Sequence, residues 1–237
     1  MSKAPINPQK IIVFTGAGIS AESGLKTFRD SNGLWENHPV ELVASVSGWR
    51  NNPELVLDFY NQRRVDAANA EPNKAHLAIA ELENKFDIVV ITQNVDDLHE
   101  RAGSSNVIHL HGSLNQARSS INSNLIYDIG SSPILLGQTC ALQSQLRPNI
   151  VFFGEIPHFL DEAKSHIIEA ACVMAIGSSL VVEPAASLLK KARFQARKIL
   201  ITLDVDKIPF GFKLQRGKAT ELVPYFCNRW LSAGKFS

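Results

Sequence analysis

Short apolar runs alternate with amphipathic stretches along most of the 237-residue chain. The apolar runs occupy residues 10–15, 86–92, 106–110, 146–155, 171–176 and 198–203. Apolar runs of this length are typical of parallel strands that helices bury on both faces. The alternation therefore predicts an α/β fold, in which a Rossmann-like parallel sheet carries helices on both faces.

Between these runs, apolar residues recur at the spacing of a helix. They predict helices at residues 53–70, 73–85, 159–170 and 184–196, and a last helix that begins near Thr220. At least five alternations of strand and helix result, which is the pattern of a single parallel sheet.

Two regions interrupt this alternation. Residues 31–76 read as a helical module, and residues 115–145 are polar and irregular, with clusters of serine, asparagine, glycine and proline. We therefore predict a Rossmann-like domain made of residues 1–30, 77–114 and 146–237. The two interrupting regions are predicted to form a smaller inserted domain.

A glycine-rich turn follows the first apolar run. Residues 16–21, GAGISA, match the G-x-G-x-x-G/A pattern that lets backbone amides approach a pyrophosphate. The acidic residue that normally binds a ribose about 20 residues later is missing, because a loop without a strand pattern follows. The turn therefore indicates a nucleotide site of altered form.

Polar residues gather where the second and third apolar runs end. Gln93, Asn94 and Asp96 follow the run at 86–92, and His111 follows the run at 106–110. The carboxyl ends of parallel strands share one edge of a sheet, where ligands bind. An amide, a carboxylate and an imidazole at this edge make a candidate catalytic site, although the general polarity of loops explains any single position equally well.

The composition argues against two classes of partner, nucleic acids and membranes. The chain has 24 basic and 23 acidic residues, so it has no field that would attract nucleic acid or a membrane, and we expect neither. Three cysteines without framework spacing suit a reducing compartment. No apolar run reaches the roughly 18 residues of a membrane span, and no signal core is visible, so we expect a cytoplasmic protein.

Seven motifs, in this order, resemble those of the sirtuins, the NAD-dependent protein-lysine deacylases. They are GAGIS at 16–20, TFRD at 27–30, GLW at 33–35, TQNVDDLHERAG at 92–103, HLHGSL at 109–114, LRPNIVFFGE at 146–155 and GSSLVVEPAA at 177–186. The resemblance extends over nearly the whole chain. It implies that NAD is the cofactor and that acylated lysines in proteins are the substrates.

The resemblance also implies roles for individual residues. His111 is the implied general base, and Asn94 and Asp96 are implied to act with it at the reacting ribose. The implied cofactor-binding residues are Gly16, Ala17, Gly18, Ser20, Phe28, Arg29, Gln93, Asn94, Asp96, Gly177, Ser178, Ser179, Thr202 and Ala219. Thr202 departs from the family, which usually has asparagine there, and a threonine hydroxyl has a shorter reach toward a ribose.

The implied substrate site extends over both parts of the chain. Its residues are Ala44, Tyr60, Arg63, Phe153, Gly154, Glu155 and Val182. The peptide would add as a strand, through main-chain hydrogen bonds. Tyr60 and Arg63 share a helix face, and the pattern alone fits a snorkelling arginine beside a half-buried tyrosine.

Within the family, Tyr60 and Arg63 resemble the pair of the bacterial, desuccinylase-type (class III) branch, which accepts acidic acyl chains. Arginine can pair bidentately with the terminal carboxylate of a succinyl or malonyl group, and the tyrosine hydroxyl adds a donor. Ala44 resembles the small residue that widens this pocket. We therefore expect both deacetylation and desuccinylation or demalonylation.

The implied reaction releases nicotinamide and yields free lysine and 2′-O-acyl-ADP-ribose. His111, with an ordinary pKa near about 6.5, can take a proton from a ribose hydroxyl at neutral pH. Two other functions stay open: an NAD-binding module without turnover, and a protein ADP-ribosyltransferase. The presence of Asn94, Asp96 and His111 favours the deacylase.

The second interrupting region departs from the family. Sirtuins generally carry two C-x-x-C pairs there that bind a structural zinc ion, but this chain has Ser119 and Asn122 at the first pair and Gly137 and Cys140 at the second. One thiol cannot build a tetrahedral zinc site, so we predict a degenerate zinc ribbon without metal. We expect apolar packing to hold the loop instead, through Ile126, Tyr127, Ile134, Leu135 and Leu136.

Overall fold

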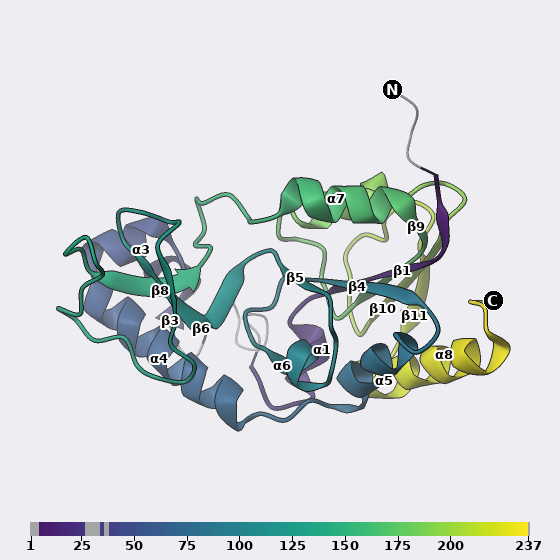
Figure 1. Cartoon of the computed structure of the whole chain (residues 1–237), viewed down its shortest axis with the longest axis horizontal. Coiled ribbons are helices and arrows are strands. Elements are labelled where there is room, and N and C mark those ends of the chain that lie inside the picture. Colours follow the sequence, from purple (N-terminus) through teal and green to yellow (C-terminus); the bar gives the residue numbers. More distant parts are fainter. Residues whose placement is uncertain (1–4, 27–33, 36–37, 237) are drawn as a thin grey trace.

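A six-stranded parallel sheet forms the larger part of the computed structural model, which describes residues 5–26, 34–35 and 38–236 (Figure 1). Its strands are β1 (Asn7–Thr15), β4 (Asp87–Thr92), β5 (Val107–His109), β9 (Ala170–Ile176), β10 (Arg197–Thr202) and β11 (Lys213–Arg216). The strand order is β11-β10-β9-β1-β4-β5. Because β4 and β9 lie on opposite sides of β1, the order reverses there, and such a reversal opens a crevice at the carboxyl ends of the strands.

Helices cover both faces of this sheet, as the apolar runs predict. Side chains alternate along β1, so that Ile11 and Val13 join one core and Ile12 and Phe14 join the other. Figure 1 shows α7 (Leu160–Glu169) on one face and α5 (Lys74–Leu82) with α8 (Ala219–Ala233) on the opposite face. The Rossmann-like α/β fold is therefore confirmed.

The helix predicted at residues 184–196 is shorter than expected. Only a 3₁₀ helix, η1 (Ala186–Lys191), forms in this stretch. Its buried residues are Ala186, Leu188 and Leu189, and Phe194 beyond it is 81% exposed. Because no apolar stripe continues past one or two turns, packing cannot stabilise a longer helix there.

The smaller part of the molecule combines short helices with two antiparallel sheets. Its elements are β2 (Leu34–Trp35), β3 (His38–Pro39), α2 (Val40–Val43), α3 (Val46–Asn51), α4 (Pro53–Asn69), β6 (Gly112–Ser119), β7 (Ile126–Asp128) and β8 (Leu146–Ile150). The helix predicted at 53–70 is confirmed, since Pro53 opens α4 and the Asn52 side chain accepts the Leu55 N–H at 3.0 Å. The exact boundaries of the two predicted domains stay a prediction.

One strand belongs to a different sheet from the one predicted. The run that begins at residue 146 was expected to continue the main sheet, but β8 pairs antiparallel with β6, in the order β7-β6-β8. Residues 115–119 and 126–128, which were expected to be irregular, belong to the other two strands, β6 and β7. The sequence of β6 is mostly polar, so it lacks the apolar pattern of a strand. Its partner β8 lies about 30 residues further along the chain, so no local turn signal indicates the pairing.

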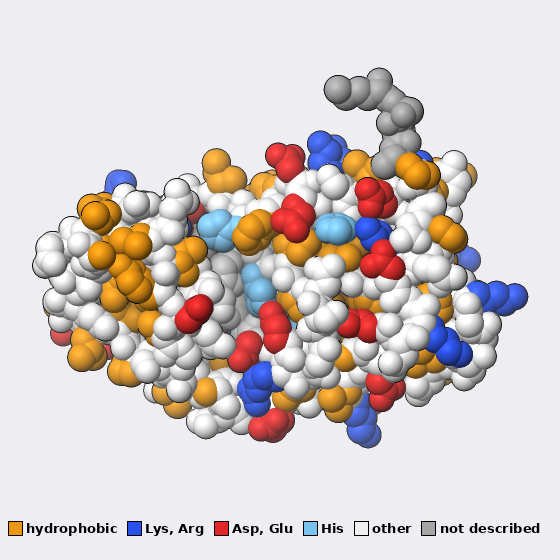
Figure 2. Space-filling view, viewed as in Figure 1, with side chains coloured by type: hydrophobic (Ala, Val, Ile, Leu, Met, Phe, Trp, Pro, Cys, Tyr) orange, Lys and Arg blue, Asp and Glu red, His pale blue; other side chains and the backbone are white. Residues whose placement is uncertain are grey.

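The expected packing of the degenerate zinc loop is correct only in part. Ile134 is 1% exposed and lies in a cluster with Leu57, Ala117, Cys140 and Leu146, against which Tyr127 packs. Ile126, Leu135 and Leu136 are 46%, 61% and 57% exposed, so they do not hold the loop. Figure 2 shows hydrophobic side chains gathered on the surface at this end of the molecule.

Hydrogen bonds connect this loop to its surroundings where apolar packing does not. The Asn61 side chain donates to the Ile134 carbonyl at 3.0 Å and accepts the Ile134 N–H at 2.9 Å, which fixes the loop on α4. At the family's cysteine positions, Ser144 Oγ lies 2.9 Å from Ser119 Oγ and 3.1 Å from Cys140 Sγ. These residues do not fit a zinc ion, and the part of the chain that the structure describes holds no group of three or more His, Cys, Asp or Glu that could bind one. The absence of zinc stays a prediction.

Two short helices carry connections at the edge of the main sheet. They are α1 (Gly18–Ala21), after the glycine-rich turn, and α6 (Leu98–Arg101), after the polar end of β4. Within residues 5–26, 34–35 and 38–236, no helix has the length and apolar content needed to cross a membrane.

Candidate active site

A cavity of about 490 Å³ lies between the edge of the main sheet and the smaller part of the molecule. Every predicted site residue that the structure describes lines this cavity. Phe28 and Arg29 lie outside the described residues. The structure therefore brings together positions as far apart in the sequence as Gly16 and Ala219, and the roles assigned to these residues stay predictions.

The glycine-rich turn packs directly against the loop that follows β9. The Gly18 N–H donates to the Gly177 carbonyl at 2.8 Å, and a Cβ built on Gly18 would lie 2.8 Å from the Gly177 Cα. Gly177 has a φ of 60°, and a Cβ there would lie 2.4 Å from the Ile19 nitrogen. Only glycine fits either position, and the turn is left with exposed backbone along the floor of the cavity.

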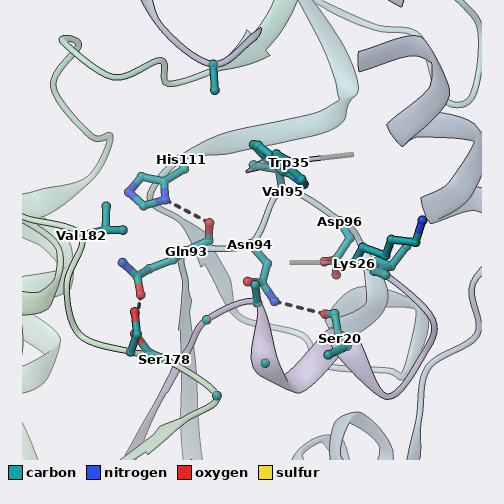
Figure 3. Close-up of a pocket in the computed structure, with 18 of the residues that line it drawn as sticks. Ser20, Lys26, Trp35, Gln93, Asn94, Val95, Asp96, His111, Ser178 and Val182 are labelled. Atoms are coloured by element: carbon teal, nitrogen blue, oxygen red, sulfur yellow. Dashed lines mark hydrogen bonds between the residues drawn. The ribbon is translucent and has the colours of Figure 1, made fainter. Parts of the chain in front are cut away.

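A chain of hydrogen bonds orders the polar end of β4. Asn94 donates from its backbone N–H to Thr92 Oγ1 at 3.0 Å and from its side chain to Ser20 Oγ at 3.1 Å (Figure 3). The Ser20 hydroxyl in turn donates to Asp96. Burial raises the pKa of the Asp96 carboxyl, although the donors Leu98 N–H and Ser20 and the nearby His109 oppose this shift. Three predicted site residues thus hold one another in place.

His111 is fixed with one ring nitrogen toward the protein. Its Nδ1 lies 3.0 Å from the Gln93 carbonyl oxygen, and because a carbonyl can only accept, Nδ1 carries the proton of the neutral ring. The lone pair is then on Nε2. Burial lowers the pKa of His111, the bond to Gln93 opposes this shift, and the nearby His158 adds to it. At neutral pH the ring is therefore uncharged and able to accept a proton.

His109, two residues earlier, is in a different electrostatic environment. Its Nε2 lies 2.7 Å from Glu100 Oε1, and its Nδ1 lies 3.1 Å from the Asn94 carbonyl oxygen. Burial alone would lower the pKa of His109, but these acceptors raise it above its ordinary value. His109 therefore supports the backbone of Asn94 and does not line the cavity, and sequence spacing alone does not separate it from His111.

Tyr60 and Arg63 reach the cavity from α4. Tyr60 is 1% exposed, and burial raises the pKa of its phenol, which keeps the hydroxyl protonated and able to donate. Arg63 is 7% exposed, and its guanidinium lies 5.3 Å from the centre of the Trp35 ring. The snorkelling interpretation is therefore wrong, because the guanidinium of a snorkelling arginine would extend into bulk water.

The loop that bears Phe153 and Gly154 is held by the predicted site residue Glu155 together with two arginines that no motif had placed in the site. Glu155 Oε1 lies 2.8 Å from Arg118 and 2.8 Å from Arg147, and Glu155 Oε2 accepts the Phe152 N–H at 2.8 Å. Burial opposes ionisation of Glu155, yet the two arginines keep its pKa below the ordinary value. The Glu155 carboxylate is therefore engaged within the protein.

The hydroxyl of Thr202, an implied cofactor contact, has a partner within the protein. The Thr202 hydroxyl donates to the Asp204 carbonyl at 2.9 Å and so closes the turn after β10. Asp204 itself lines the cavity, where no sequence motif had placed an acidic residue. The site therefore includes a carboxylate at the end of β10.

Comparison with known proteins agrees with this geometry. The Sir2 family model matches residues 16–184. NAD-dependent protein deacylases from Helicobacter pylori (strain ATCC 700392 / 26695) and Vibrio vulnificus (strain YJ016) are 53% and 45% identical to the chain. The first alignment covers 79% of this chain and 82% of the relative, and the second covers 94% of each.

Solved structures lead to the same family. A mutant Sir2 homologue in complex with ADP-ribose has a TM-score of 0.87 at 40% identity, covering 95% of this chain and 93% of its own. A Sir2 homologue in complex with NAD has a TM-score of 0.85 at 39% identity, covering 96% and 91%. This chain belongs to the Sir2 family.

Proposed function

We propose that this protein is an NAD-dependent protein-lysine deacylase that removes both acetyl groups and the acidic succinyl and malonyl groups. The observation that carries the proposal is the neutral imidazole of His111 in a cavity whose other end bears Tyr60 and Arg63. The first group supplies a base, and the second supplies donors for an acyl carboxylate. The names of the relatives in Helicobacter and Vibrio support the reaction class.

The floor of the cavity fits NAD. The glycine cradle, the backbone of Gly16 to Gly18, packs so closely on Gly177 and Ser178 that no Cβ fits between them; it lines the cavity without side chains at its two glycines, and backbone amides of such turns can approach a pyrophosphate. Ala17, Ser20 and Ser179 would lie along it, with Thr202 and Ala219 toward the adenosine. When bound, NAD supplies a nicotinamide leaving group on a ribose carbon that an acyl oxygen can attack.

In this proposal, Asn94 and Asp96 orient the reacting groups and His111 moves a proton. Both side chains are held by Ser20, which limits their freedom before substrate arrives and so reduces the entropy that orientation costs. His111 Nε2 accepts a proton from a sugar hydroxyl, while the Nδ1–H group continues to donate its hydrogen bond to the Gln93 carbonyl. The low pKa of His111 keeps this base available at neutral pH.

The other end of the cavity would choose the acyl group. Arg63 is charged at neutral pH, and a guanidinium can bind a carboxylate through two parallel hydrogen bonds. The Tyr60 hydroxyl stays protonated and can add a third donor. Ala44 and Val182 also line the cavity, and their apolar side chains suit contact with an alkyl chain.

The proposal is tested by product analysis. The protein is incubated with NAD and matched acetyl-lysine or succinyl-lysine peptides, and the products are identified by mass spectrometry. We expect nicotinamide, free lysine peptide and acyl-ADP-ribose with both peptides. ADP-ribosylated protein without free acyl-ADP-ribose would favour the transferase, and NAD binding without nicotinamide release would leave only a binding module.

A further inference from the structure

We infer that Ser178 is a positioning residue that sets the hydrogen-bond polarity of the active site. Its hydroxyl holds the Gln93 amide with the NH₂ group toward the cavity, so that Gln93 can only donate to the sugar hydroxyl from which His111 takes a proton. This inference rests on the proposed deacylase function. It assigns to Ser178 the orientation of the Gln93 amide, whereas the family resemblance implies a contact with the cofactor.

Ser178 uses its hydroxyl both as a donor and as an acceptor. Ser178 Oγ donates to Gln93 Oε1 at 2.8 Å and accepts the Leu180 N–H at 3.2 Å. A hydroxyl has one proton and two acceptor positions, so it makes both bonds at once. Ser178 is 4% exposed, so water does not compete for this bond.

The Gln93 amide is then left with one orientation. Its Oε1 faces Ser178, so its Nε2, which carries two donors and no acceptor, faces the cavity. Figure 3 shows the Gln93 amide nitrogen and the unbonded ring nitrogen of His111 on the same side of the Gln93 backbone, both toward Val182. The Gln93 carbonyl holds His111 from the other side, at 3.0 Å from Nδ1.

This arrangement fixes where a hydroxyl proton can go. A sugar hydroxyl held between the two side chains would accept from Gln93 Nε2 through its oxygen and would donate its proton to His111 Nε2. The His111 ring would then carry a proton on each nitrogen, while Gln93 Nε2 would still donate to the sugar oxygen. With the amide reversed, the hydroxyl would donate to Gln93 Oε1, and His111 would lose its proton donor.

The test compares Ser178→Ala with Ser178→Thr, which keeps the hydroxyl, and with Ser165→Ala as a control. Ser165 is an exposed serine whose hydroxyl donates only to the Asp161 carbonyl of its own helix. Loss of one orienting hydrogen bond is expected to slow deacylation by about tenfold in Ser178→Ala. Exchange of free nicotinamide into NAD needs no hydroxyl proton, so we expect it to change by less than about twofold. Ser178→Thr should recover most of the deacylation rate.

A second variant, Gln93→Glu, replaces the hydrogen-bond donor that faces the cavity by an acceptor, with a side chain of the same shape. In Gln93→Glu, Ser178 still donates to one carboxylate oxygen, but the oxygen that faces the cavity can only accept. The sugar hydroxyl then donates to this oxygen in place of His111, and we expect deacylation to fall by about 100-fold. Ser178→Ala should add little to this loss, because the bond that it removes no longer orients an amide.

A measurement without NAD or peptide checks the orientation itself. The side-chain amide resonances of Gln93, assigned by their loss in Gln93→Glu, should be sharp and resolved in wild type and Ser178→Thr. In Ser178→Ala they should broaden or move toward the values of an exposed amide. The resonances of the Gln93 backbone should stay in place.

Three results would overturn the inference: an unchanged deacylation rate in Ser178→Ala, an equal loss of exchange and deacylation in that variant, or Gln93 amide resonances that do not respond. Equal losses would assign Ser178 to cofactor binding. A wild-type protein that releases no nicotinamide would overturn the proposed function itself, and with it this inference, so the two failures can be told apart.

Discussion

The two ends of the cavity are built in different ways. At the sheet edge, Gln93, Asn94 and His111 sit at the ends of neighbouring parallel strands, whose ladder fixes their spacing. At the proposed acyl end, Tyr60 and Arg63 come from one helix, α4. The side chains of Arg64 and Asn61 bond this helix to the backbone of Leu114 and Ile134. A side chain can therefore change at the acyl end without disturbing the reacting groups. We infer that the chemistry belongs to the first end and acyl selectivity to the second.

The largest effect is expected at the sheet edge. His111→Ala removes the proposed base and should lower turnover by about 10³-fold with acetyl and succinyl peptides alike. Binding of NAD, measured by calorimetry, should change little, because the ring bonds to the Gln93 backbone and not to the glycine cradle. A turnover within tenfold of wild type would assign the base to another residue.

At the acyl end, Arg63→Met should have a large but selective effect. The loss of a charged, bidentate contact is expected to lower kcat/KM for a succinyl peptide by roughly 10- to 100-fold. The matched acetyl peptide has no carboxylate and serves as the internal control, with an expected change below about threefold. Equal losses for both peptides would mean that Arg63 supports the fold of the cavity and not its selectivity.

The charged group behind the Phe153 loop should matter for stability more than an exposed ion pair. In Glu155→Gln, Arg118 and Arg147, with side chains 8% and 7% exposed, lose their carboxylate, and we expect about 2 kcal/mol less free energy of unfolding. Glu71→Gln is the matched control: its partner Arg101 lies 3.3 Å away, but the Glu71 side chain is 82% exposed. In urea unfolding, this control should lose less than about 0.5 kcal/mol of its free energy of unfolding. Similar losses in both variants would contradict the view that the Glu155 group stabilises the fold more than an exposed ion pair.

The smallest effect concerns pH. Burial holds the pKa of His111 below its ordinary value, so the ring stays an available base until the pH falls through that lowered pKa. The acid limb of a kcat/KM profile should therefore lie below about pH 6.5. An acid limb at or above pH 7 would show that His111 is more basic than its surroundings indicate.

Local pattern predicted the main sheet and helix α4, but not the strands β6 and β7 of the smaller part. The strands β1, β4, β9 and β10 contain buried apolar runs, such as residues 11–14 in β1 and 88–91 in β4, because helices bury both faces of the sheet. The partners of β6 are set by contacts distant in the sequence, and its polar residues carry no strand signal. A buried parallel strand can therefore be read from its own residues, whereas a mostly polar strand depends on its neighbours.

The site shows the same limit. Motifs brought Gln93 and Ser178 into the predicted site, but not the hydrogen bond between them, which joins positions 85 residues apart. Likewise, no motif linked Arg118 to Glu155, because the pair forms only when β6 packs against the loop after β8. Residue types at strand ends can be predicted, while the direction of each hydrogen bond requires the folded geometry.

The most direct test of the division between the two ends is the ratio of kcat/KM for succinyl to acetyl peptides, measured in wild type, His111→Ala and Arg63→Met. The ratio should be unchanged in His111→Ala, where both rates fall together, and should fall by roughly 10- to 100-fold in Arg63→Met. A ratio that changes in His111→Ala, or that stays constant in Arg63→Met, would contradict the separation of chemistry from acyl selectivity.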